Sequence, residues 1–168
     1  MPQDYPNLDF ARQLMSCKST SDYGKNENVS GSSDKQVDMQ DAGGCLAYVN
    51  LNYRSSNKSL MQCAVSNYVC NDKREQLYES VRQLTNNCYQ SKKMKQKYAH
   101  KMAHIVVQDA MQKTLSKREC ASILGVSKAT YSEHHAPVFN FVSNELDCVL
   151  SIADDIAGDY WRKTFMVR

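Results

Sequence analysis

The chain has 168 residues, 42% of them hydrophobic, and a formal net charge of +3. This length is sufficient for one sizeable core, or for a small core with an extension, and we favour the second. The chain contains no run of about 18 apolar residues, which argues against a membrane-spanning helix, and its first residues lack the basic and then apolar order of a signal peptide. We therefore expect a cytoplasmic protein that makes no contact with a membrane.

The charge is distributed unevenly along the chain. Residues 1–72 and residues 136–168 each carry a net charge of −2, whereas residues 73–135 hold twelve Lys and Arg against five Asp and Glu, a net charge of +7. A surface that faces phosphate groups requires a basic segment of this kind.

The seven cysteines are an odd number in a chain without an export signal, so we expect reduced thiols rather than disulfides. Cys88, Cys120 and Cys148 are predicted to lie on apolar helix faces, where a thiol behaves as a small hydrophobic group.

The first 72 residues are predicted to form two segments. Residues 1–44 are expected to be a flexible, poorly ordered arm with one short possible helix around Leu8 to Met15, because most of the segment is too polar to bury enough apolar surface. Residues 45–72 form a poorly defined strand or loop segment. The alternation of apolar and polar residues from Cys45 to Tyr53 predicts a single strand, and Leu60 to Val69 fits either a strand or a short helix.

Residues 73–168 are predicted to form one helical domain. Two scaffold helices open it, the first beginning at Lys73 and the second covering Ser91 to Lys113, and each has one apolar stripe. The stripe of the first helix consists of Leu77, Val81, Leu84 and Cys88.

A helix-turn-helix is predicted at residues 116–135. With Lys117 as position one, Ala121 is at position five and Gly125 at position nine, where the motif requires a small residue and a turn glycine. His134 occupies the core-facing eighteenth position, although histidine is a poor core residue. The other core-facing positions hold the apolar residues Cys120, Leu124, Val126 and Tyr131.

The boundaries of these two helices also have sequence signals. Ser116 and Glu119 have the spacing of a capping box at the start of the first helix, and Gly125 can adopt the left-handed conformation that ends it. Ser127 is a natural N-cap for the second helix, which we expect to end before Pro137.

A long amphipathic helix is predicted after Pro137, because apolar residues recur there at alternating spacings of three and four. Two interpretations are open. The stripe can pack onto the other helices of the same chain, or it can form a homodimer through Phe139, Val142, Leu146, Val149 and Ile156. The whole stripe consists of Phe139, Val142, Leu146, Val149, Ala153, Ile156 and Tyr160.

The second helix of a helix-turn-helix fits the major groove of DNA, where its first residues reach the base edges. Lys128 can donate to guanine, Glu133 can accept from cytosine, and Ala129 can contact a thymine methyl group. Thr130 and Ser132 are expected to contact phosphates or both phosphates and bases. The predicted DNA-binding residues are Ser127, Lys128, Ala129, Thr130, Ser132 and Glu133 in the second helix, Lys117 and Arg118 in the first, and Lys92, Lys93, Lys95 and Lys97 before them.

The five lysines between residues 92 and 101 allow two interpretations. A run of charge usually does no more than solvate a helix face. This run comes one helix before the recognition unit, so it can also contact phosphates, which would add affinity and salt dependence without sequence preference.

The sequence contains little that points to chemistry. His100 and His104 have the spacing of a metal-binding pair on a helix, but no Glu follows His100 in the protease pattern and no pair of cysteines is separated by two residues. No Gly-rich phosphate loop is present. We predict no metal, no cofactor and no enzymatic activity.

The order of a helical scaffold, the motif SKRECASILGVSKATYSE and the amphipathic segment VFNFVSNELDCVLSIA resembles the DNA-binding part of small bacteriophage regulators, above all the Q-type late-gene antiterminators of lambdoid phages. The resemblance covers roughly residues 73 to 160. It implies a protein that binds DNA near a late promoter, loads onto RNA polymerase in the cytoplasm of the bacterial host and makes it ignore terminators. Lys128, Ala129, Ser132 and Glu133 would then read the DNA. Several members carry paired-cysteine zinc motifs, which this chain lacks.

The sequence therefore predicts a mainly α protein, with a helix-turn-helix domain, a long C-terminal amphipathic helix and a poorly ordered N-terminal arm. The predicted function is a sequence-specific DNA-binding regulator of transcription, with double-stranded DNA as one partner and bacterial RNA polymerase as a possible second. Two alternatives are a DNA-recognition subunit similar to a small terminase, and a helical protein-interaction module that binds no DNA.

Overall fold

The computed structural model describes residues 4–16, 38–111 and 114–166. These residues are helical throughout their regular segments and contain no strand, which confirms the mainly α class. The helices are α1 (Pro6–Ser16), α2 (Met39–Asn52), α3 (Lys58–Cys70), α4 (Arg74–Ser91), α5 (Lys97–Met111), α6 (Lys117–Leu124), α7 (Lys128–Thr130) and α8 (Ala136–Met166), with a π-helical turn, η3 (Tyr131–His135), between α7 and α8.

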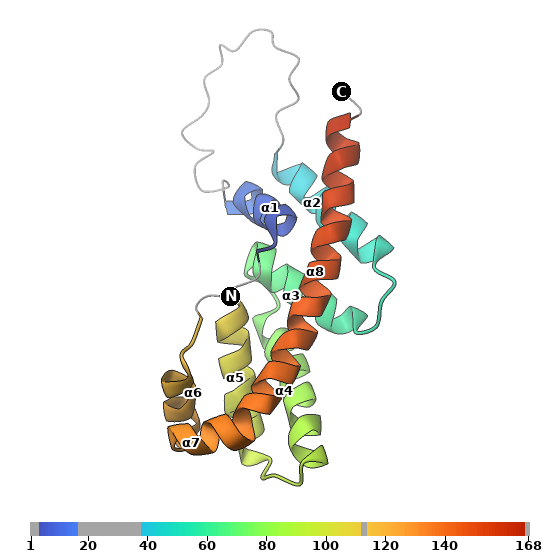
Figure 1. Cartoon of the computed structure of the whole chain (residues 1–168). Coiled ribbons are helices and arrows are strands. Elements are labelled where there is room, and N and C mark those ends of the chain that lie inside the picture. Colours follow the sequence, from blue (N-terminus) through green and yellow to red (C-terminus); the bar gives the residue numbers. More distant parts are fainter. Residues whose placement is uncertain (1–3, 17–37, 112–113, 167–168) are drawn as a thin grey trace.

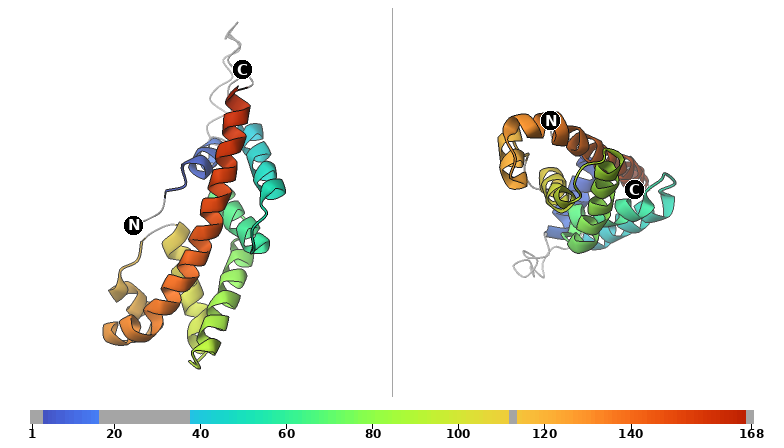
Figure 2. Two further views of the ribbon diagram at one scale, coloured as in Figure 1. Left: turned by 45° about the vertical axis from the view of Figure 1, so that its right-hand side comes forward. Right: turned by 90° about the horizontal axis from the view of Figure 1, so that it is seen from below.

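The long helix α8 is the axis of the molecule. It runs from one end to the other, with α1, α2 and α3 around its C-terminal half and α4 and α5 against its N-terminal half (Figure 1). The α6–α7 unit lies at the lower end, beside α5 (Figure 2). Because α8 contacts each of the helices α1 to α5, one hydrophobic cluster extends from Tyr5 to Trp161.

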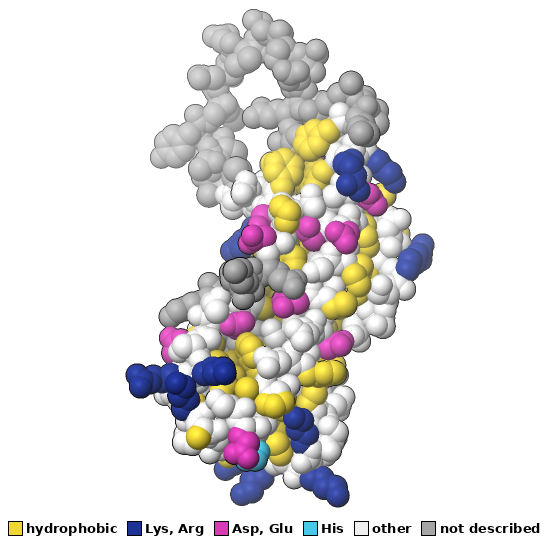
Figure 3. All heavy atoms as spheres, viewed as in Figure 1, with side chains coloured by type: hydrophobic (Ala, Val, Ile, Leu, Met, Phe, Trp, Pro, Cys, Tyr) yellow, Lys and Arg dark blue, Asp and Glu magenta, His cyan; other side chains and the backbone are white. Residues whose placement is uncertain are grey.

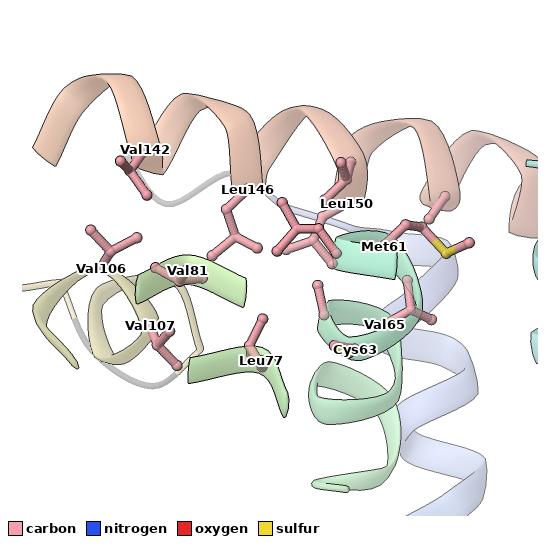
Figure 4. Packing of buried hydrophobic residues seen from close by; sticks show 14 of the residues in the cluster. Met61, Cys63, Val65, Leu77, Val81, Val106, Val107, Val142, Leu146 and Leu150 are labelled. Atoms are coloured by element: carbon pink, nitrogen blue, oxygen red, sulfur yellow. The ribbon is translucent and has the colours of Figure 1, made fainter. Parts of the chain in front are cut away.

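The alternating three and four spacing of α8 serves to build this core. Val142 and Leu146 are fully buried, and Leu146 lies above Val81 of α4 while Leu150 approaches Met61 of α3 (Figure 4). Val149 and Ala153 are also buried, and the remaining stripe residues, Phe139, Ile156 and Tyr160, are partly buried.

The predicted dimer contact is therefore wrong for its central residues. Val142, Leu146 and Val149 are at most 3% exposed within a single chain, so they cannot meet a second chain without opening the core. The stripe packs onto the other helices of the same chain, which was the first of the two interpretations of this helix.

The predicted strand from Cys45 to Tyr53 is also wrong, because residues up to Asn52 belong to α2. Asp38 starts this helix with a capping box to Asp41, and the residues that it buries, Ala42, Cys45 and Val49, have spacings of three and four. A lone strand would have left its backbone groups without partners, whereas a helix satisfies them internally. The ambiguous segment from Leu60 to Val69 is helical in α3.

The N-terminal helix confirms the short helix predicted around Leu8 to Met15, but it is part of the core rather than of an arm. Asp154 of α8 is buried and accepts hydrogen bonds at 2.9 Å from the backbone amides of Asn7 and Leu8. The Trp161 indole donates to the Asn7 carbonyl at 3.1 Å. Residues 38–44 likewise belong to the connection into α2 and to α2 itself, and residues 17–37 of the predicted arm lie outside the described residues.

Cys120 is buried and Cys88 is partly buried, as predicted, but Cys148 is exposed. The six cysteines in the described ranges are free thiols. No helix in the described ranges combines the length and the apolar character that a membrane crossing requires.

Candidate nucleic-acid interface

The first helix of the predicted helix-turn-helix begins and ends where the sequence indicated. The Ser116 hydroxyl accepts from the Glu119 amide at 3.2 Å, and the Glu119 carboxylate accepts from the Ser116 amide at 2.8 Å. Gly125 ends α6 with φ at +73°. The Val126 amide then donates to the Ala121 carbonyl at 3.0 Å, which closes the turn.

The second helix begins at Ser127, whose hydroxyl accepts from the Thr130 amide at 3.1 Å and donates to the Thr130 hydroxyl at 2.8 Å. The hydroxyls of Ser127 and Thr130 therefore both take part in the N-cap. On the inner side, Tyr131 is buried against α6 and shares a side-chain hydrogen bond with Cys120. Burial raises the pKa of both groups, so both stay neutral near pH 7.

The second helix does not end before Pro137, which corrects the sequence prediction. It continues through η3 into α8, so that residues 128–166 are one continuous helix with a π-turn near its start. The amide of Ala136 donates to the Tyr131 carbonyl, five residues back instead of four. Inside an α-helix the Pro137 ring would collide with a carbonyl group of the preceding turn. The wider π-turn avoids this collision.

The structure also shows which of the two neighbouring histidines faces the core. The side chain of His134 is 53% exposed, whereas His135 is 1% exposed, so the eighteenth position of the motif is not the buried one. His135 follows Tyr131 by four residues and precedes Val138 by three, the spacing of one buried helix face. The prediction for His134 is wrong because the second helix continues into α8, whose buried stripe extends back through His135.

His135 joins three helices. Its Nδ1 lies 2.9 Å from the hydroxyl of Tyr89, near the end of α4, and its ring packs edge-on against Tyr98, at the start of α5, with centroids 4.7 Å apart. Burial lowers the pKa of His135, with a smaller contribution from His134. The cluster of Tyr89, Tyr98 and His135 had no sequence signal, because its members are far apart in the chain.

This cluster positions the lysines that precede the helix-turn-helix. The residues 92–96 connect Tyr89 of α4 with Tyr98 of α5, and we call them the lysine loop. The predicted helix from Ser91 to Lys113 begins only at Lys97, because Lys93 adopts a left-handed conformation with φ at +54°. Lys92, Lys93 and Lys95 therefore lie on a loop rather than on a helix face, and His135 holds both ends of that loop against η3.

The outer side of the second helix is open to solvent. Lys128, Ala129, Ser132 and Glu133 are all exposed, whereas Tyr131 and His135 of the same helix are buried. We call these four residues the exposed face. Glu133 lies 3.7 Å from His134, which is also exposed.

The surroundings of the exposed face are basic. Lys117 and Arg118 are exposed in the first turn of α6. In Figure 3, Lys and Arg side chains stand out at the lower end of the molecule and again near its upper end, while Asp and Glu lie mainly across its middle, with an acidic group also at the lower end. Lys97 lies over the Tyr98 ring, 5.0 Å from its centroid. All twelve predicted DNA-binding residues thus belong to α6, to the second helix or to the lysine loop and the first residue of α5.

His100 and His104 have the spacing of a metal-binding pair, and the structure places them in contact with each other. The rings of His100 and His104 are in edge-on contact, with centroids 4.7 Å apart, and burial lowers the pKa of His104. The described part of the chain contains no group of three or more His, Cys, Asp and Glu side chains placed to hold a metal ion.

Comparisons of the chain with protein-family models, with curated proteins and with solved structures found no match. The described residues define an all-helical fold in which a helix-turn-helix unit is fused, through a π-turn, to a long central helix.

Proposed function

We propose that this protein binds double-stranded DNA through the exposed face of α7 and η3 and regulates transcription. The observation that carries the proposal is the division of one helix into a buried side, with Tyr131 and His135, and an exposed side, with Lys128, Ala129, Ser132 and Glu133. The residues of the buried side are explained by their packing in the core. The second side buries nothing, and its residue types match the donors, acceptors and methyl contacts that base edges require.

The lysine loop supports the same proposal. A helix end can read bases only when nearby cations hold the duplex in position, because phosphate contacts supply most of the affinity. The loop lies beside the second helix, and within the described ranges none of its lysines forms an ion pair.

The experiment measures the binding of duplex DNA at several salt concentrations. We expect a preferred duplex, selected from a random pool, to lose affinity steeply as salt increases. Lys128→Ala should cost about 1 to 3 kcal/mol on that duplex and relax one base position. Lys58→Ala, at the start of α3 and far from the site, is the matched control. An affinity that stays flat from low to high salt would refute DNA binding and favour a protein-interaction module.

The narrower proposal is antitermination, in which the DNA-bound protein loads onto RNA polymerase. It rests on the resemblance to Q-type antiterminators alone. Capture of RNA polymerase together with mapped DNA sites would support it. A small-terminase role would instead require a large ring, which solution mass detects. The central residues of the α8 stripe, Val142, Leu146 and Val149, are buried within the single chain.

A further inference from the structure

The helix that begins at Lys128 keeps a buried side and an exposed side beyond the end of the helix-turn-helix. Buried residues recur in it at spacings of four, three and four: Tyr131, His135, Val138 and Val142. The residues two positions after each of these are exposed: Glu133, Pro137, Asn140 and Asn144. Two residues of an α-helix correspond to a rotation of about 200°, so the four exposed residues form a stripe on the side opposite the core. We call them the outer stripe.

The outer stripe begins inside the exposed face and continues past it. Glu133 belongs to the exposed face, and Asn140 follows it by seven residues, which is about two full turns. Asn140 therefore projects from the same side of the helix as Glu133, about 10 Å further along the axis. The sequence predicted that the second helix ends before Pro137, so Asn140 was not among the predicted DNA-binding residues.

The side chain of Asn140 is available to a ligand. It is exposed, and its amide forms no hydrogen bond with the described residues. Residues 136–144 include no charged residue, so this part of the helix has no side chain that repels a phosphate group. The next acidic residue, Glu145, is half-buried and accepts a hydrogen bond from the Asn57 side chain at 3.1 Å.

The shape of DNA decides what Asn140 meets when the exposed face lies on the base edges. The major groove winds around the duplex, whereas the helix from Lys128 to Met166 continues without a break, so only its first turns stay close to the bases. The turn that carries Asn140 then rises towards the rim of the groove, where the sugar-phosphate backbone lies. Asparagine is one of the side chains that donate to phosphate oxygens.

We propose that the DNA-binding surface extends from the helix-turn-helix onto the first two turns of α8, where the Asn140 amide donates to a backbone phosphate as the helix leaves the major groove. The inference rests on the proposed function. The contact reads no sequence, but it fixes how the helix is seated in the groove. Because asparagine is neutral, its contact releases no counterion, which distinguishes it from the contacts of the lysine loop.

The first test removes the amide from the full chain. Asn140→Ala should weaken binding to the selected duplex and to a scrambled duplex by the same factor, about fivefold, which is the size of one typical hydrogen bond. The slope of affinity against salt should not change. A loss confined to the selected duplex would assign Asn140 to a base and overturn the phosphate contact. Unchanged affinity for both duplexes would mean that α8 does not touch DNA.

The second test adds a charge at the same position, and its expected gain of affinity cannot come from unfolding. Asn140→Lys should strengthen binding to both duplexes by about tenfold at low salt and steepen the salt dependence by about 1, because one further phosphate is neutralised. Asn144→Lys, one turn further along the outer stripe, is the matched control and should have a much smaller effect, because the helix has left the groove there. Equal effects of the two lysines would indicate a long-range attraction and would overturn the inference.

The outcome for the proposed function is distinguishable from the outcome for Asn140. If Lys128→Ala weakens binding to the selected duplex while neither Asn140 variant changes it, only the extension onto α8 is refuted. If the wild-type chain binds no duplex at any salt concentration, the proposed function and the extension are both refuted.

Discussion

The two ends of α8 use charged side chains in opposite ways. At the end formed with α1, acidic groups are bound into the fold: Asp154 accepts from the start of α1, and Asp147 accepts from the Tyr5 hydroxyl at 2.9 Å. At the α6–α7 end, the lysine loop leaves its cations in solvent, without ion pairs in the described part of the chain. The charges at the first end hold the fold together, whereas those at the second are available to a polyanion.

The largest expected effect is a loss of stability at the end of α8 that packs with α1. Asp154→Ala removes an acceptor from the backbone amides of Asn7 and Leu8 and from the Asn7 side chain, and should lower the free energy of unfolding by about 3 kcal/mol, because one buried and two partly buried donors lose their partner. Urea denaturation measures the change. Asp155→Ala, the exposed neighbour, should have almost no effect, and equal losses in both variants would mean that Asp154 does not anchor α1.

The next effect belongs to the basic end. Replacing Lys92, Lys93, Lys95 and Lys97 with Gln should weaken DNA binding by about 100-fold at low salt and reduce the slope of affinity against salt by about 3, because up to four phosphate contacts are lost. Stability should not change. Replacing Arg54, in the connection between α2 and α3, and Lys58, the first residue of α3, with Gln provides a control. If both variants lose the same affinity, the comparison between the two ends does not hold.

Two glycines test whether the helix-turn-helix depends on its turn. Gly125 has φ at +73°, so Gly125→Ala should destabilise the protein by about 1 to 2 kcal/mol although nothing lies within 4 Å of the added carbon. Gly43 has equally open space but lies inside α2. Gly43→Ala should instead stabilise by up to about 1 kcal/mol, as alanine favours a helix. Thermal unfolding distinguishes these opposite signs.

The smallest effect concerns pH. Burial lowers the pKa of His135 below its ordinary value of 6.5, so the unfolded chain binds more protons at mildly acidic pH. The stabilisation from neutral His135 is therefore complete above about pH 6.5 and is lost as the pH falls below it. Unfolding in urea between pH 7.5 and 5.5 measures this loss. The loss of stability should be smaller in His135→Phe than in the chain that retains His135. Both chains carry His104→Gln, because the pKa of His104 is lowered as well. An equal loss with and without His135 would contradict the assignment.

The sequence alone determined the local features of this protein. The capping box at Ser116, the turn at Gly125 and the N-cap at Ser127 were predictable because each depends on residues within one turn of one another. The long helix after Pro137 was predictable from its spacing.

Tertiary structure decided the features that depend on residues distant in the chain. The alternation in Cys45 to Tyr53 fitted a strand, and only packing against α8 and α1 selects a helix there. In the candidate site, the position of the lysine loop depends on the contact of Tyr89 and Tyr98 with His135, which are distant from one another in the chain. The sequence thus determined the caps and turns, whereas contacts between helices distant in the chain decided the remaining elements and how they pack.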